Sequence, residues 1–151
     1  MFDPSCRVDV ALRSHRNLYV TALTQANGWY LAGVSKRVLG WENFTLLRLS
    51  NHEVALKTAH GKYVTAFPAE DGWSLRGRAD RILGWEIFRI HYLSGERDEA
   101  FGRGGASREL AVALETHHGK WVRGGGAEQG FRLSADSAEL SADCKFTMRL
   151  L

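Results

Sequence analysis

Histidine and basic side chains recur in three short segments that could each form a turn at the surface. The segments are SHRN at 14–17, AHGK at 59–62 and HHGK at 117–120. Imidazole groups gain positive charge as the pH falls through about 6.5, so these turns could bind an acidic surface more tightly in acid. A His-Gly-Lys sequence is also a good polar turn without any ligand, and the sequence leaves both interpretations open.

Basic residues flank these turns and also occur in two later connections of the chain. Charged residues usually form a solvated face, and acidic residues are interspersed among these. Their recurrence at matching positions would still create patches able to meet an acidic filament or another polyanion. The candidates for such binding are Arg13, His15, Arg16, Lys36, Arg37, Lys57, His60, Lys62, Arg76, Arg78, Arg81, His117, His118, Lys120 and Arg123.

Four tryptophans also occupy matching positions, and exposed indole rings could stack against sugars. A residue repeated at matching positions more often fills the core or caps a hairpin. We therefore predict that Trp41 and Trp85 are core residues. Trp29 and Trp73 adjoin turns, and we keep these two as carbohydrate-binding candidates.

No arrangement of residues in the chain indicates an enzyme, a metal site or a cofactor. Ser, His and Asp residues fall in turns, without a nucleophile elbow, paired carboxylates or a phosphate-binding loop between a strand and a helix. Basic and aromatic residues form no clear platform for nucleic acid. Cys6 and Cys144 lack metal-ligand spacing, and we expect two free thiols, with a bridge between them as the alternative.

These residues belong to a sequence pattern that occurs three times in the chain. VALRSHRNLYVTA from Val10 matches VALKTAHGKYVTA from Val54, and both match VALETHHGKWVRG from Val112. The copies run over about 8–49, 53–93 and 110–151, and the third follows an insertion at 94–109. We expect this charged, Gly-containing insertion to be a solvated loop, with a partner-contacting loop as the alternative.

Each copy contains short runs rich in Val, Tyr, Trp, Phe and Leu, in which apolar and polar residues alternate. This pattern predicts four strands per copy, at 8–13, 18–23, 29–33 and 44–49 in the first. No segment has the three- or four-residue apolar spacing of a helical repeat. Propellers typically need at least four blades, whereas this chain has three copies.

About twelve strands, in copies that cannot each bury an apolar face alone, predict closure into a three-fold barrel. Closure also removes exposed sheet edges. We therefore predict an all-β chain that forms a single β-trefoil domain over residues 1–151. In this fold Leu12, Leu56 and Leu114 would meet about a common axis.

The openings at Val10 and Val54, and the closings GWENF at 40–44 and GWEIF at 84–88, resemble the fascin-like β-trefoil domains. The resemblance extends from about residue 8 to residue 151, and it implies actin-filament binding. Bundling members of that family carry several trefoils in one chain. The histidine turns are similar, more weakly, to those of the hisactophilin family of actin-binding trefoils.

Carbohydrate binding remains the alternative function, although the Gln-x-Trp motif that usually marks lectin trefoils does not occur in the chain. A protein-interaction domain with neither ligand is a third possibility. Either partner, actin filament or glycan, fits a non-catalytic binding module without cofactors.

Composition sets broad limits on the chain. A net charge of +3 is only mildly basic, and 44% hydrophobic residues suit a folded domain. No apolar run is long enough to span a membrane, and the first residues lack the apolar core of a signal peptide. We expect a soluble, cytoplasmic protein that is a monomer or weak dimer and does not bind nucleic acid.

Overall fold

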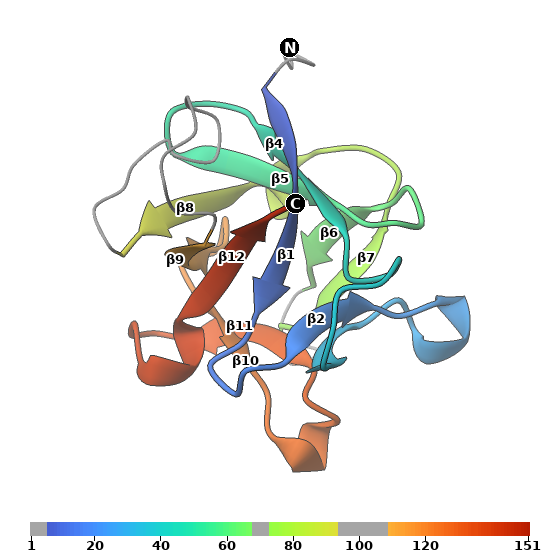
Figure 1. The fold of residues 1–151 in the computed structure, drawn as a ribbon. Helices are drawn as coiled ribbons and strands as arrows, with labels where there is room; N and C mark the ends of the chain where they lie inside the picture. The colour runs from blue at the N-terminus through green and yellow to red at the C-terminus, as the bar shows by residue number, and fades with distance from the viewer. Residues whose placement is uncertain (1–5, 68–72, 94–108) are drawn as a thin grey trace.

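The computed structural model describes residues 6–67, 73–93 and 109–151, and these residues form short strands joined by turns and 3₁₀ helices (Figure 1). The first copy contains β1 (Arg7–Arg13), β2 (Tyr19–Ala22), β3 (Leu31–Ser35) and β4 (Phe44–Arg48). The second contains β5 (Glu53–Lys57), β6 (Tyr63–Ala66), β7 (Leu75–Ala79) and β8 (Phe88–Tyr92). The third contains β9 (Glu109–Glu115), β10 (Trp121–Gly124), β11 (Leu133–Ser137) and β12 (Phe146–Leu150). The insertion predicted to be a loop lies outside the described residues, except for Glu109.

Six of these strands close a barrel. The first and fourth strands of each copy pair antiparallel in the ring β1–β4–β5–β8–β9–β12, and β12 returns to β1. The second and third strands of each copy form the hairpins β2–β3, β6–β7 and β10–β11. The predicted all-β class and β-trefoil architecture are therefore confirmed (Figure 1).

The barrel surrounds one apolar core to which all three copies contribute. Leu12, Leu56 and Leu114 are each almost fully buried and belong to the same cluster, as the prediction required. Equivalent strands supply equivalent residues because alternate side chains on each strand point inward. Burial of this shared core is what a single copy could not achieve.

The three hairpins are joined to one another by backbone hydrogen bonds. The carbonyl oxygen of Trp29 accepts a bond of 2.8 Å from the amide of Gly77, and that of Trp73 accepts one of 2.7 Å from Ala135. The carbonyl oxygen of Phe131 accepts a bond of 2.9 Å from the amide of Gly33, which closes the ring of three. We call these three bonds the hairpin ring.

Each aromatic residue of the hairpin ring has a left-handed backbone, which is uncommon for a bulky side chain. The φ angles are 62° at Trp29 and 59° at both Trp73 and Phe131. Such a conformation costs about 1–3 kcal/mol and persists only where the surrounding structure holds it. The prediction that a strand begins at Trp29 was wrong for this reason, and β3 begins at Leu31.

The third copy keeps the barrel but replaces a buried carboxylate of the other copies. In the first copy, Glu42 accepts bonds from the Thr21 hydroxyl (2.6 Å) and the Leu39 amide (2.8 Å). Cys144 takes the equivalent position in the third copy and is fully buried. Cys6 and Cys144 form no disulfide with each other, as expected, and Cys6 is only partly buried.

A charged cluster compensates for the missing carboxylate. Arg123 stands where the first copy has Thr21, and its guanidinium group lies 2.6 Å from Asp136 and 3.6 Å from Asp143. This hydrogen-bonded partner lowers the pKa of the Asp136 carboxyl below its usual value near 4.

Gly77 gives a direct test of packing between a hairpin and its turn. A Cβ atom at position 77 would lie 2.5 Å from the methyl carbon of Thr58. Thr58 would have to move, although its hydroxyl accepts bonds from the amides of His60 and Lys62. We expect Gly77→Ala to lower the free energy of unfolding by about 1–3 kcal/mol in urea denaturation.

Gly33, at the equivalent position of the first copy, provides the control. It faces Ser14, which lacks the methyl group, and an added Cβ would lie 3.5 Å away. Gly33→Ala should leave stability nearly unchanged, and Thr58→Ser should restore most of the stability lost in Gly77→Ala. Equal losses for the two alanine variants would contradict this account of the packing.

The contribution of Asp136 to stability should depend on pH. Because its pKa is lower in the folded chain than in the unfolded chain, the ionised carboxylate stabilises the fold above about pH 4. This contribution is lost as the pH falls through the folded-state pKa. Asp136 is partly exposed, so we expect Asp136→Asn to cost about 0.5–1 kcal/mol at neutral pH, with the difference from wild type disappearing in acid.

Asp80 is the matched control for that titration. Lys62 also lowers the pKa of its carboxyl, but the Asp80 side chain is largely exposed. Solvent screens such a pair, so Asp80→Asn should lower stability less than Asp136→Asn does. If the difference in free energy of unfolding between wild type and Asp136→Asn grew as the pH fell, the predicted direction of the pH dependence would be wrong.

Candidate functional site

Buried hydroxyl groups fix the turns between the first and second strands of each copy. The Thr58 hydroxyl accepts bonds from the amides of His60 and Lys62, and Thr116 does the same for its own turn. The backbone is left-handed at Asn17, Gly61 and Gly119, which occupy one equivalent position. The four histidines lie in these turns, as predicted, and each turn is closed in the same way.

His60 packs between two tryptophans of the preceding copy. Its ring centre lies 5.8 Å from that of Trp29 and 5.2 Å from that of Trp41. Its Nε2 is 2.9 Å from the carbonyl oxygen of Ala22, which can only accept, so Nε2 carries the proton. His60 therefore joins the second copy to the first.

His118 repeats this arrangement at the next boundary between copies. Its ring centre lies 4.6 Å from that of Trp73 and 5.8 Å from that of Trp85. Its Nε2 atom is buried and has no hydrogen-bond partner among the described residues. Contacts with the two indole rings hold this imidazole in place.

The third boundary has a different chemistry. Arg16 stands where the other turns have His60 and His118, and its guanidinium carbon lies 5.8 Å from the centre of the Phe131 ring. Asp143 replaces the second tryptophan of the cluster. The tryptophan–histidine clusters therefore exist at two of the three boundaries.

Trp41 and Trp85 are surface residues, and the prediction that they belong to the core was wrong. They are 46% and 42% exposed. The residues that follow them, Glu42 and Glu86, are buried and accept bonds from the backbone of their own loops. Because the glutamate side chain takes the inward position, the neighbouring indole remains on the outer surface.

Trp29 and Trp73, predicted as sugar-stacking candidates, are instead partly buried. Trp73 packs against the core cluster, and each indole contacts an imidazole from the next copy. Trp41 and Trp85 contact the same imidazoles and are the more exposed pair.

Each exposed tryptophan stands beside an exposed leucine, which sequence reasoning missed. Leu39 is 62% exposed and Leu83 is 61% exposed. Together they define two equivalent surface features, which we call the Leu-Gly-Trp loops, at residues 39–41 and 83–85. The signal was present in the sequence as the apolar runs VLGW and ILGW, which fall between strands.

The second Leu-Gly-Trp loop borders a cavity of about 270 Å³. Leu83, Trp85 and His117 line it, and the imidazole of His117 lies against Gly84. The first loop lacks this wall because Ala59 stands in place of His117. The two loops thus share their apolar residues and differ in one imidazole.

Several predicted basic residues are paired within the chain. Arg13 lies 3.3 Å from Glu109, and this hydrogen bond raises the pKa of Arg13. Lys62 lies 2.6 Å from Asp80, and Arg123 is bound to two aspartates. The acidic partners therefore partly neutralise the positive charge of these three side chains.

Other predicted basic residues stack on aromatic rings. Such cation–π contacts hold a cation over the face of the ring. The pairs are Lys57 with Tyr63, Arg76 with Tyr30, Arg78 with Phe67 and Arg16 with Phe131.

The remaining predicted residues are spread over two regions. Lys36, Arg37 and Arg81 are exposed and precede the Leu-Gly-Trp loops by a few residues, so basic and apolar side chains share the same connections. His15 is exposed and Lys120 is partly buried, both in the turns. Three basic candidates therefore lie within a few residues of the exposed tryptophans in the chain.

The described residues contain no cluster of three or more His, Cys, Asp or Glu side chains that could hold a metal ion. Among the same residues, no helix has the length and apolar character needed to cross a membrane.

Comparison with solved structures supports the fold. The chain is similar to the designed three-fold symmetric protein ThreeFoil, with a TM-score of 0.73 and 14% identity over 95% of this chain and 99% of that one. It is also similar to the BEL β-trefoil (TM-score 0.70, 10% identity, 95% and 93% covered). The SDF2-like protein from Arabidopsis thaliana gives a TM-score of 0.65 at 9% identity, with 93% and 91% covered.

No protein-family model matches the chain, and no curated protein sequence matches it. At such low identities the solved structures establish the fold alone. The chain is a β-trefoil with an internal three-fold repeat, and this fold is compatible with a non-catalytic binding module.

Proposed function

We propose that this chain is a non-catalytic protein-binding module that contacts its partner through the two Leu-Gly-Trp loops. The supporting observation is the exposure of Leu39, Trp41, Leu83 and Trp85 at two equivalent positions. Exposed clusters of large apolar side chains on soluble domains commonly mark interaction surfaces. Tryptophan is also enriched among the residues that contribute most to protein interfaces.

The residues around the loops define the chemistry of the partner. Lys36 and Arg37 precede the first loop, and Arg81 precedes the second. A complementary partner therefore has apolar pockets for leucine and tryptophan next to acidic groups on its surface. Because charge contributes to the contact, added salt should weaken binding.

An actin filament is the partner that we propose first. The motifs that resemble fascin-like domains support it, as does the need for an acidic, partly apolar surface. In this proposal the protein acts in the cytoplasm, a reducing setting that suits Cys6 and Cys144, which form no disulfide with each other.

The two loops belong to different copies, and this matters for crosslinking. A lone domain that bundles filaments must either dimerise or present two separate contacts. Equivalent loops in the first and second copies supply two such contacts within a monomer, whereas the third copy has Asp143 in place of the tryptophan. We therefore propose a bivalent monomer.

Cosedimentation separates binding from bundling. High-speed pelleting with actin filaments reports binding, and low-speed pelleting reports bundles. Changing both Leu83 and Trp85 to alanine should abolish bundling but keep binding through the first loop. Changing Leu39 and Trp41 as well should weaken binding by at least about thirtyfold, as expected from the loss of tryptophan anchors.

Leu140→Ala is the matched control, because Leu140 is an exposed leucine in the corresponding connection of the third copy. It should leave both pelleting assays unchanged. Wild-type protein that fails to pellet with filaments at low salt would remove actin as the partner. Unchanged binding by the fourfold variant would remove the loops as the binding site.

A further inference from the structure

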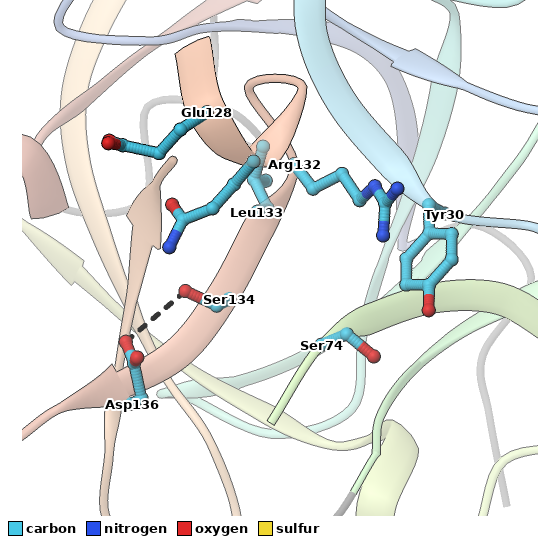
Figure 2. Close-up of a pocket in the computed structure, with 8 residues that line it drawn as sticks. Tyr30, Ser74, Glu128, Arg132, Leu133, Ser134 and Asp136 are labelled. Carbon is cyan, nitrogen blue, oxygen red and sulfur yellow. Dashed lines mark hydrogen bonds between the residues drawn. The ribbon is translucent and has the colours of Figure 1, made fainter. Parts of the chain in front are cut away.

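A polar pocket of about 380 Å³ lies beside the hairpin ring (Figure 2). Tyr30, Ser74 and Arg132 occupy equivalent positions in the three copies, and all three line the pocket. Isolated β-bridges pair Tyr30 with Arg76 of the second copy and Ser74 with Ser134 of the third. The pocket is thus built where the hairpins of all three copies meet.

Aromatic stacking fixes the Arg132 side of the pocket. The guanidinium carbons of Arg132 and Arg76 each lie 4.3 Å from the centre of the Tyr30 ring. Arg76 also donates a 2.7 Å hydrogen bond to the Tyr30 hydroxyl. Figure 2 shows the Arg132 side chain extended toward Tyr30, so its guanidinium group is held at the pocket wall.

The opposite side of the pocket carries hydrogen-bond acceptors and an amide. Ser134 donates a 3.2 Å bond to Asp136, as Figure 2 shows, and Arg123 holds the same carboxylate. Glu128 and Gln129 also line the pocket. The Gln129 carbonyl accepts a bond from the Gly126 amide, and its NH₂ group can donate to a ligand.

The third copy has a glycine run at 124–126 next to residues that line the pocket. A Cβ atom on Gly125 would lie 2.3 Å from the carbonyl oxygen of Arg132 and 3.2 Å from the side chain of Gln129. The first and second copies have Leu23 and Phe67 at this position. The 3₁₀ helix η4 (Ala127–Gln129) follows the glycine run, and its Glu128 and Gln129 side chains line the pocket.

The charges select among ligand classes. Arg132 contributes one positive charge, Glu128 one negative charge, and the carboxylate of Asp136 is balanced by Arg123. The two carboxylates disfavour a simple anion, and the guanidinium groups disfavour a simple cation. A neutral ligand with several hydroxyl groups can bond to the acceptors and the donors together.

The geometry points to a binding site for one neutral sugar unit in this pocket. Its volume lies at the small end of the range for ligand sites, about 300–1,000 Å³, which suits a single ring. Leu133 adds an apolar surface for the ring carbons. No residue of the Leu-Gly-Trp loops takes part, so this site is independent of the proposed actin contact.

Amide chemical shifts measured by NMR can test the site with defined probes. The probes are the methyl glycosides of glucose, galactose, mannose and N-acetylglucosamine, each titrated to tens of millimolar, with sodium sulfate as the anionic probe. We expect at least one glycoside to cause saturable shifts at residues 128–134 and at Tyr30 and Ser74. Sulfate should leave these amides unchanged.

Variants separate the pocket from the rest of the molecule. Arg132→Ala should weaken binding of the sugar by at least about tenfold, since charge-assisted hydrogen bonds are lost. Arg7→Ala, an exposed arginine on β1, is the control and should bind like wild type. Both variants should keep a dispersed spectrum and wild-type actin pelleting, which distinguishes this test from that of the loops.

Two results of the NMR titration with wild-type protein would overturn the assignment. One is the absence of saturable shifts at the pocket with all four glycosides. The other is a stronger response of the same amides to sulfate than to any glycoside. If Arg132→Ala loses spectral dispersion, Glu128→Gln is tested in its place. A Glu128→Gln variant that binds the sugar as tightly as wild type would also contradict the site.

Discussion

Three backbone hydrogen bonds join the hairpins into a ring, and the surface features of the molecule depend on them. Each bond uses the carbonyl of an aromatic residue with a left-handed backbone, at Trp29, Trp73 or Phe131. The hydrogen bond from the next copy helps to hold that strained conformation, together with bonds that the Trp29 and Phe131 amides donate within their own copies. Each copy therefore depends on the next one for part of its hairpin structure.

The candidate sites follow from this constraint. Two of the ring aromatics, Trp29 and Trp73, also contact the imidazoles of His60 and His118, which come from the next copy. Those imidazoles support the inner side of the exposed tryptophans, so the Leu-Gly-Trp loops are held by contacts across the boundary. At the third boundary, Arg16 of the first copy and Asp143 of the third replace the histidine and the second tryptophan. The third copy also has a glycine run, which lies next to residues that line the polar pocket.

Much of the fold was predictable from the sequence because it depends on local alternation and on the repeat. The apolar positions of VAL and YVTA repeat in register, so the strands, the closed barrel and the burial of Leu12, Leu56 and Leu114 could all be inferred. The exposure of Trp41 could not, because it depends on a buried Glu42 and on an imidazole 19 positions later in the chain. The neutralisation of Arg123 and Lys62 likewise depends on partners that only the folded chain brings close.

Native-state hydrogen exchange tests the central claim most directly. The amides of Gly33, Gly77 and Ala135 donate the three bonds of the ring. If ring closure is required for every copy, these amides should exchange only by global unfolding, with one shared free energy equal to that from denaturation. Exchange of any of the three at a much lower free energy, while the barrel strands stay protected, would contradict the account.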